Sequence, residues 1–324
     1  MLNRRQVTLT GLAALAASSG PSFAQGWPTK PITFVVPLAA GGGVDMMARL
    51  LAENLGEALG QRVIVENQGG AGGTIAAARV ARADPDGYTY IFQSVSSAVV
   101  NALVYRNLSY DPVKDFAPVT LFSRFPLVAT TNPEIPAKDL KEFIALLKAN
   151  PDKYSYGSSG VGTVTHLAGE LFKSLTGVQM VHVPYRGNSA VLTDLLANRV
   201  ALTFDGIAPL LQHIHGGTLR ALGVTTAERS PALPDVPAMR EVIPGYELPF
   251  WTGLYAPART PKEIIDRVAA ETAKIVGKPE VEKRLGELGV VGVGMPAGEF
   301  DTFWRQQLAY YGKIVEANKI TVGP

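Results

Sequence analysis

The segment from Ile32 to Leu55, ITFVVPLAAGGGVDMMARLLAENL, runs from a strand pattern through three glycines into a helix pattern. Its first residues are apolar or β-branched, which favours a buried strand. After Gly43, apolar residues recur at intervals of three and four, which predicts a helix with one buried face. A strand joined to a helix through a glycine loop is the repeating unit of α/β folds.

The same unit recurs along most of the chain. RVIVEN (62–67), a glycine loop, TIAAARVARA (74–83) and YTYIFQS (88–94) follow, and a second series of strands and helices spans 125–226. The proline-rich stretch 230–249 interrupts the alternation and is typical of a long connection. A helical region (261–288), the strand VVGVG (290–294) and a final helix (299–318) complete the pattern. We therefore predict an α/β protein with parallel sheets.

The length of the chain predicts two lobes. Its 324 residues exceed the roughly 100–200 of a single domain. The part after Phe250 is too short for a third domain, so it should return to the first lobe. We expect two chain crossovers, near Phe122–Val128 and Glu247–Gly253. They give a discontinuous first domain, residues 27–124 with 250–324, and a second domain, residues 125–249.

Residues 1–24 have the features of a secretory signal. Arg4 and Arg5 precede the apolar run LTGLAALAA, and small residues lead to a predicted cut after Ala24. The run is shorter than the about 20 residues that span a bilayer. Both the general and the twin-arginine export routes fit these residues. We expect a periplasmic protein that depends on burial for its stability, because the sequence has no cysteine.

The charge of the chain argues against nucleic acid as a partner. Loss of Arg4 and Arg5 with the signal lowers the formal net charge from +2 to 0. A chain with 47% hydrophobic and 18% charged residues is typical of a globular protein. No basic patch marks a binding surface for nucleic acid.

Six loops at the predicted strand ends are rich in glycine or hydroxyl residues: 39–45, 67–73, 93–97, 156–165, 185–190 and 204–206. In α/β sheets, ligands bind where such loops lead into helix N-termini. Glycine allows consecutive N–H groups to converge on one anion, although any single loop can simply be a tight turn. Arg186 is the only basic side chain in these loops. They predict a cleft in which amides, hydroxyls and helix dipoles hold a small carboxylate.

Five motifs, in order, resemble the Bug family of periplasmic substrate-binding proteins of tripartite tricarboxylate transporters (TctC-like): PLAAGGGVDMMARLLAENL, VENQGGAGGTIAAARVARADPDGYT, YGSSGVGTVTHLAGELF, VPYRGNSAVLTDLLANRV and GLYAPARTP. The resemblance covers essentially the whole mature chain. It implies a two-lobed periplasmic binding protein of type II, which closes on a small carboxylate in the manner of a Venus flytrap.

The resemblance also implies which residues meet the ligand. The loops Ala39–Asp45, Gly70–Gly73 and Ser158–His166 would contact it, partly through water, and Asp205 resembles a position that faces the cleft. The hydroxyls of Ser158, Ser159 and Thr163, beside the helix after Gly162, are the expected donors to a carboxylate. The full set of candidate ligand-binding residues is Leu38, Ala39, Ala40, Gly41, Gly42, Asp45, Gly70, Ala71, Gly72, Gly73, Ser94, Ser96, Ser158, Ser159, Gly162, Thr163, His166, Tyr185, Arg186 and Asp205.

Four of these side chains have two interpretations. We expect Asp45 to cap the following helix, although it can accept a hydrogen bond from a ligand donor. Asp205 either accepts from the ligand or holds loop amides in place. Tyr185 and Arg186 either close over the ligand or bridge the lobes.

Enzyme and metal functions fit the sequence less well. Ser159, His166 and Asp205 are the residue types of a hydrolase triad, but the serine lacks the G-x-S-x-G pattern and the chain order differs. His213 and His215 have no accompanying carboxylate or cysteine at ligand spacing. The glycine loops do not complete a dinucleotide fingerprint. We expect no catalysis, no metal and no cofactor.

The expected partners follow from a carboxylate cleft. We predict a monomer that passes its solute, with small dicarboxylates as the first candidates, to the membrane permease subunits of a transporter. Presentation of the bound solute to a sensor kinase is an alternative, because the cleft would be physically identical.

Overall fold

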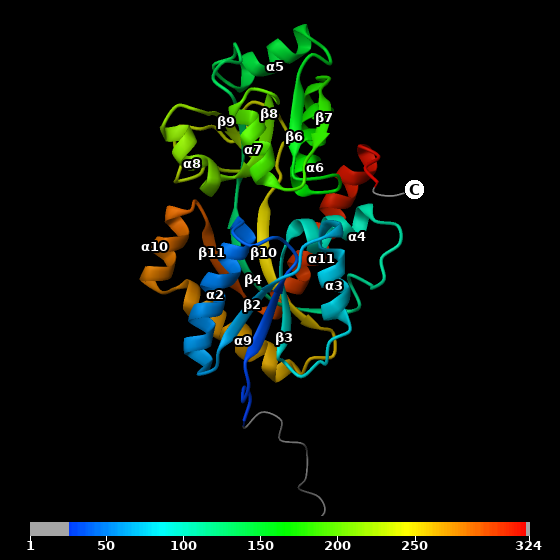
Figure 1. The fold of residues 1–324 in the computed structure, drawn as a ribbon, viewed down its shortest axis with the longest axis vertical. Coiled ribbons are helices and arrows are strands. Elements are labelled where there is room, and N and C mark those ends of the chain that lie inside the picture. Colours follow the sequence, from blue (N-terminus) through cyan, green and yellow to red (C-terminus); the bar gives the residue numbers. More distant parts are fainter. Residues whose placement is uncertain (1–25, 322–324) are drawn as a thin grey trace, which may run out of the picture.

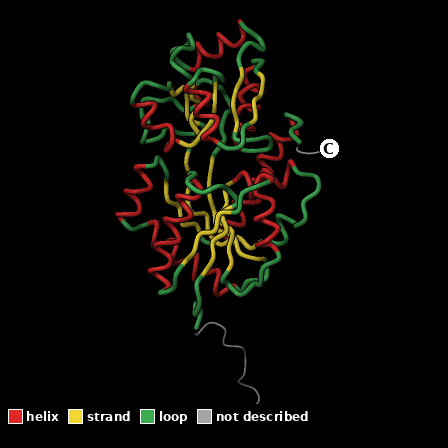
Figure 2. Tube along the Cα trace, in the orientation of Figure 1, coloured by secondary structure: helices red, strands yellow, loops and turns green. Residues whose placement is uncertain are grey.

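The structure, a computed structural model, describes residues 26–321. It contains two β-sheets, one in each half of the molecule along its long axis (Figure 1). Figure 2 shows the two groups of strands joined by extended segments. The expected signal, residues 1–24, lies outside the described residues. No helix of the described part is long and apolar enough to cross a membrane.

The first sheet has six strands in the order β11–β4–β10–β3–β1–β2. Their bounds are β1 (Ile32–Val36), β2 (Val63–Asn67), β3 (Thr89–Ser94), β4 (Phe116–Phe125), β10 (Phe250–Pro257) and β11 (Val291–Met295). β1 pairs in parallel with β2 and β3, so these three strands end at the same edge. β10 is antiparallel to β3 and β4, and β11 is antiparallel to β4.

Helices cover the first sheet: α2 (Gly43–Leu59), α3 (Thr74–Ala81), α4 (Asn101–Val104), α9 (Lys262–Val276), α10 (Pro279–Glu287) and α11 (Ala297–Ala317), with the short turns η1 (Ala71–Gly73) and η2 (Ser96–Val100). α2 packs beside α9, and α11 packs on β4 and on η2. Trp304 of α11 is buried against Tyr255, and its Nε1 donates to the carbonyl of Ala98 at 3.0 Å. This hydrogen bond fixes η2, and with it the end of β3, to the core.

The second sheet has five strands in the order β7–β6–β8–β5–β9. Its strands are β5 (Leu127–Thr131), β6 (Ser155–Ser158), β7 (Val181–Pro184), β8 (Leu202–Gly206) and β9 (Arg220–Val224). Its helices are α5 (Leu140–Ala149), α6 (Val164–Thr176), α7 (Asn188–Leu196), α8 (Ile207–His215) and the short η3 (Met239–Glu241). β6 is parallel to β7 and β8, while β5 is antiparallel to β8 and β9.

The chain crosses between the sheets where the sequence predicted. β4 ends at Phe125 and β5 begins at Leu127, and the return path enters β10 at Phe250. Phe125 and Phe250 are paired in register, with ring centroids 4.6 Å apart. The hydroxyls of Tyr310 and Tyr311 on α11 donate to backbone carbonyls just before β10. The two crossovers therefore lie side by side and are held by the C-terminal helix.

One expectation about the elements was wrong. Both sheets are mixed, not parallel throughout, because the strands that flank the crossovers, β4 and β10 in one sheet and β5 and β9 in the other, run antiparallel to their neighbours. The helical region 261–288 is two helices, since Gly277 follows the end of α9 and Pro279 starts α10. The final helix, α11, lies within two residues of its predicted bounds.

Candidate functional site

The loops after β1, β2 and β3 lie together at the edge of the first sheet that faces the second sheet (Figure 1). The first two loops touch: a methyl group added at Gly69 would lie 3.5 Å from the nitrogen of Ala39. Leu38, Ala39, Ala40, Gly41 and Gly42 are all exposed. Within the described chain, α2 starts after Gly42 without a side-chain cap, so its first N–H groups can meet an anion.

Asp45 holds the first loop rather than facing outward. Its Oδ2 accepts from the amide of Gly41 at 2.8 Å and from Arg49 at 3.0 Å, and its Oδ1 accepts from Asn67 at 2.9 Å. Burial alone would raise the pKa of Asp45, but these hydrogen bonds hold it below its ordinary value. Asp45 therefore stabilises the loop through its hydrogen bonds. The expectation that it caps α2 was wrong, because the N-cap is Gly42.

The second loop has an unusual backbone. Gly70, Ala71, Gly72 and Gly73 all have positive φ angles, of 121°, 46°, 64° and 94°. A non-glycine residue such as Ala71 adopts this conformation at a cost on the order of 1 kcal/mol or more. Asn101 donates to the carbonyl of Gly72 at 2.8 Å, and a methyl group at Gly72 would lie 2.7 Å from the hydroxyl of Tyr105. The protein therefore maintains a strained loop, which fits a site that needs converging amides.

The turn after β3 reaches the other lobe. Ser94 is buried in the strand, whereas Ser96 opens η2, a turn of π-helical type. The Oγ of Ser96 accepts a hydrogen bond from the amide of Val164, the first residue of α6, at 3.2 Å. Single π turns often occur at functional sites, because they redirect side chains. Ser96 thus links the first sheet directly to the start of a helix in the second.

The loop between β6 and α6 is organised by its own hydroxyls. Thr163 caps α6 by accepting from the amide of His166 at 3.3 Å. The amide of Ser159 donates to Thr165 at 3.0 Å, and its hydroxyl lies 2.9 Å from the same oxygen. Ser158 is fully buried and Ser159 is half-buried. Ser159 and Thr163 are therefore better placed than Ser158 to reach a solute.

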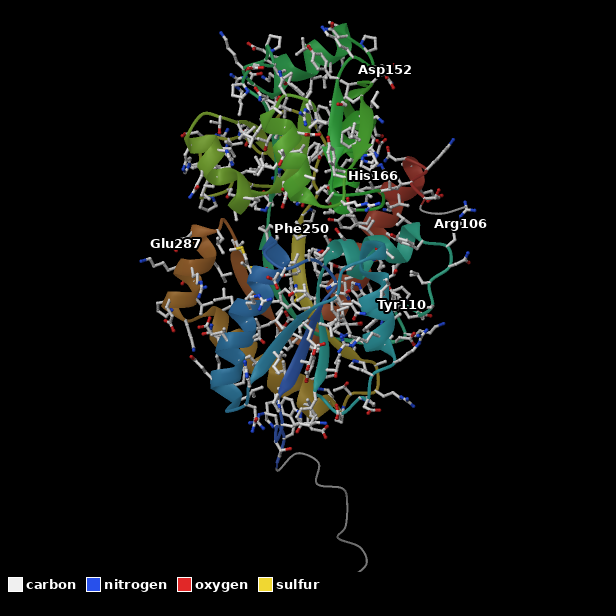
Figure 3. All side chains as sticks on the ribbon, in the orientation of Figure 1. Arg106, Tyr110, Asp152, His166, Phe250 and Glu287 are labelled. Carbon is white, nitrogen blue, oxygen red and sulfur yellow. The ribbon has the colours of Figure 1, made fainter. Side chains whose placement is uncertain are left out.

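Two histidines that look isolated in the sequence are stacked in the structure. The rings of His166 on α6 and His182 on β7 are 4.0 Å apart and nearly parallel, at 10°. His182 Nε2 lies 2.7 Å from the Oγ of Ser158, and His166 Nδ1 accepts from the amide of Gly162 at 3.2 Å. Figure 3 places His166 near the junction of the lobes. Sequence reasoning missed His182, since only the parallel pairing of β6 with β7 brings it to Ser158.

The loops after β7 and β8 contribute Asp205 and its neighbours. Asp205 is buried, and its Oδ1 accepts from the amide of Gly206 at 2.7 Å and from Asn188. Burial raises the pKa of this carboxyl to about 7, against the effect of both hydrogen bonds. Tyr185 donates to Asp194 of α7 at 2.8 Å, so its hydroxyl is engaged within its own lobe. Arg186 is exposed.

The residues of a hydrolase triad are not assembled. The hydroxyl of Ser159 pairs with Thr165, His166 accepts from Gly162, and Asp205 is held by Gly206 and Asn188. Ser158 does contact His182, but the serine is fully buried. Among residues 26–321, no group of three histidine, aspartate or glutamate side chains could hold a metal ion.

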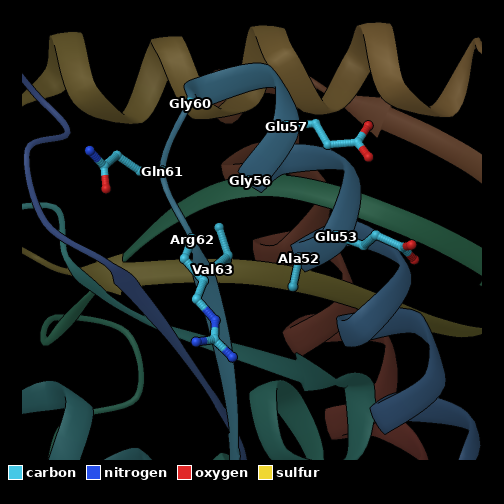
Figure 4. A pocket seen from close by; sticks show the side chains of 8 residues that line it. All are labelled: Ala52, Glu53, Gly56, Glu57, Gly60, Gln61, Arg62 and Val63. Carbon is cyan, nitrogen blue, oxygen red and sulfur yellow. The ribbon is translucent and has the colours of Figure 1, made fainter.

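Two surface hollows lie away from these loops. The hollow in Figure 4 is formed by residues 52–63, at the C-terminal end of α2 and the start of β2. That end of α2 is opposite to Gly43, where the loops gather. A second hollow lies between residues 102–113 and Leu308. Neither hollow includes any of the candidate residues.

Comparison with known proteins shows the family. The family model described as the tripartite tricarboxylate transporter family receptor, TctC, matches residues 47–320. The chain belongs to this family. A relative from Pseudomonas sp. (strain P51), the UPF0065 protein in the tcbD-tcbE intergenic region, is 38% identical over 321 residues, 97% of this chain and 95% of the relative.

Solved structures agree with the TctC assignment. One described as a periplasmic transporter is 40% identical, with a TM-score of 0.85, and the match covers 91% of this chain and 99% of that one. The R. palustris protein Rpa4515 with adipate is 36% identical, with a TM-score of 0.86 and the same coverage. This TctC-type chain is therefore a solute-binding protein with the α/β fold of periplasmic binding proteins.

Proposed function

We propose that this TctC-family protein captures a small carboxylate between its two lobes in the periplasm and delivers it to the permease subunits of a tripartite tricarboxylate transporter. One observation carries the proposal. The uncapped start of α2 and the run of positive φ angles at Gly70–Gly73 lie at the edge of the first sheet that faces the loop before α6. Backbone donors of the first lobe thereby face the polar loop of the second lobe across the junction of the lobes.

The composition of these loops supports a carboxylate. Arg186 is the only basic side chain in the six loops, so an anion would depend on amides, hydroxyls and helix dipoles. A hydrogen bond to a charged group contributes about 1.5–3 kcal/mol, so a few of them suffice for reversible binding. The adipate named for the 36% identical Rpa4515 is a dicarboxylate and has the chemistry that such donors suit.

The proposal includes the candidate ligand-binding residues and the division of the chain. Residues 27–124 with 250–324 would form one domain and residues 125–249 the other, moving about the paired crossovers at Phe125 and Phe250. The protein would act as a monomer without turning its solute over, and residues 1–24 would be removed on export.

A thermal-shift panel tests the carboxylate. A ligand that binds only the folded state adds about 2.7 kcal/mol of stability at a hundredfold excess over its Kd. In a chain of this size, each kcal/mol raises the Tm by roughly 2–4 °C. We expect shifts of several degrees from succinate, adipate or related carboxylates, and none from sugars or simple amines. Stabilisation by sugars or amines alone would overturn the proposal.

The same panel tests for catalysis. An ester substrate incubated with the protein should remain intact, because the triad residues are bonded to other partners. Hydrolysis that disappears in Ser159→Ala would show an enzyme instead.

A further inference from the structure

The His166–His182 pair lies directly behind the loop that joins β6 to α6. The two ring centroids are 4.0 Å apart, and the ring of Tyr156 on β6 also stacks on His182, with a centroid distance of 4.8 Å. His166 is 8% exposed, so this column of three rings is largely shielded from solvent. Each imidazole bonds to a different part of the same loop.

The hydrogen bonds define which ring atoms can carry a proton. His166 Nδ1 accepts from the amide of Gly162, and an imidazole nitrogen that accepts a hydrogen bond carries no proton. Protonation of His166 would place an N–H against the N–H of Gly162 and break this contact. His182 Nε2 meets the Oγ of Ser158, which also accepts from the amide of Gly160 at 3.2 Å. The pair thus fixes two loop glycines, one directly and one through a serine.

The surroundings of the pair favour neutral rings. Burial lowers the pKa of His166, and burial together with His166 lowers the pKa of His182 to about 4. Glu170 of α6 opposes this effect, but it is engaged by Tyr156 at 2.5 Å and by Lys173 at 2.9 Å. Within residues 26–321, Glu170 and Lys173 are the other charged groups that shift either imidazole. β8 and α11, which also pack against α6, add none in that range.

We infer that His166 and His182 are positioning residues for the loop Ser158–Thr163, and that His166 holds this loop in its binding conformation only while its imidazole is uncharged. The inference rests on the proposed function of this loop. A charge on one ring would also repel a charge on the other across 4.0 Å. Acid would therefore loosen the loop and weaken solute binding.

Two substitutions of His166 distinguish the loss of the hydrogen-bond acceptor from the effect of charge on the ring. His166→Asn places an amide oxygen close to the position of Nδ1, so it can still accept from Gly162 but cannot be protonated. His166→Leu fills similar space without an acceptor. His215→Asn on α8, which is exposed, is the matched control. Adipate, or the carboxylate with the largest shift in the panel above, is titrated by calorimetry at pH 7.5 and 5.5.

We expect His166→Leu to bind that carboxylate about tenfold more weakly than His166→Asn at pH 7.5, the effect of one lost hydrogen bond. Comparison of variants at one pH cancels the protonation of the solute itself. From pH 7.5 to 5.5, wild type and His215→Asn should lose more affinity than His166→Asn. Equal affinities for the Leu and Asn variants, or equal losses in acid for all proteins, would overturn the inference.

A measurement without solute checks the protonation state directly. Long-range ¹H–¹⁵N spectra of histidine-labelled protein distinguish protonated from unprotonated ring nitrogens. We expect His166 Nδ1 to be unprotonated at pH 7.5, and a protonated Nδ1 there would refute the inference. If no carboxylate of the panel stabilises the wild-type protein, the proposed function itself fails. If carboxylates bind but the variants do not differ, only the role of the pair fails.

Discussion

Asp205 is the carboxyl whose environment most opposes ionisation. Burial at the end of β8 raises its pKa from the ordinary 3.8 to about 7. The folded protein then binds this proton more tightly than the unfolded chain does. The resulting stabilisation is complete below the unfolded value and is lost as the pH rises through about 7.

Asp205→Asn should remove this dependence on pH. The asparagine can still accept from Gly206 through its oxygen, but it has no charge to bury. We expect the variant to gain stability relative to wild type by roughly 3 kcal/mol more at pH 8 than at pH 4.5. Urea unfolding at both values measures the difference. Asp152→Asn, at an exposed position, is the control, and an equal change at both pH values would contradict the account of Asp205.

At the scale of residues, the sequence identified which side chains matter in the loops, but not their hydrogen-bond partners. Asp45 and Asp205 were each left with two roles, and the structure uses both to hold loop amides. Asp45 also pairs with Arg49, four residues away on the same helix. Its partner Asn67 and the Asp205 partner Asn188, however, are 22 and 17 residues away, on different elements. No local pattern encodes such contacts, which arise only when the strands are assembled.

At the scale of elements, the loop Gly70–Gly73 provides the clearest test of binding through the backbone. Gly72 has a φ of 64°, whereas proline fixes φ near −65°, so Gly72→Pro must reshape the loop. We expect this variant to lose measurable carboxylate binding, while Arg186→Ala weakens binding by less than about tenfold, as expected for an exposed charge. Calorimetry on folded variants decides the ranking.

The control for this ranking is Gly60→Ala. Gly60 also has a positive φ, of 68°, but it lies at the far end of α2. This variant should lower the Tm slightly and leave the affinity for carboxylates unchanged. A larger loss in Arg186→Ala than in Gly72→Pro would move the anion site to the arginine.

Ser96 tests the contact between the two sheets. Its hydroxyl accepts from the amide of Val164 at 3.2 Å, and Ser96→Ala leaves that helix N-terminus without this partner. We expect carboxylate affinity to fall by about five- to tenfold, the value of one hydrogen bond. Calorimetry measures it against Ser174→Ala, an exposed serine on α6 outside these loops. Equal affinities for the two variants would remove Ser96 from the site.

The periodicity of the sequence predicted most elements but not their irregularities. The amphipathic patterns of α2 and α11 were recognised because one face of each is buried. The π turn at Ser96–Val100 has no such pattern, since its residues are buried almost all round. Gly277 followed closely by Pro279 indicates a break between two helices. The apolar periodicity of 261–288 continues across this break, so the sequence pattern predicted one helical region.

At the scale of the molecule, the crossovers could be predicted and the strand directions could not. The short segment after Phe250 implied a return to the first lobe, and β10 does pair with β3 and β4. Alternating strands and helices suggest parallel sheets, but a chain that leaves a sheet and comes back adds antiparallel strands. This arrangement brings loops from both sheets to one junction, bridged at Ser96 and Val164.

The central claim is that the glycine loops of the first lobe and the polar loop before α6 of the second lobe hold one carboxylate between them. Hydrogen–deuterium exchange with mass spectrometry, with and without saturating adipate or the best carboxylate of the panel, tests it most directly. We predict that the carboxylate slows deuterium uptake in peptides covering residues 39–45, 70–73 and 159–165 together. Deuterium uptake at the hollow formed by residues 52–63 should not change. Protection confined to one lobe, or centred on residues 52–63, would contradict the claim.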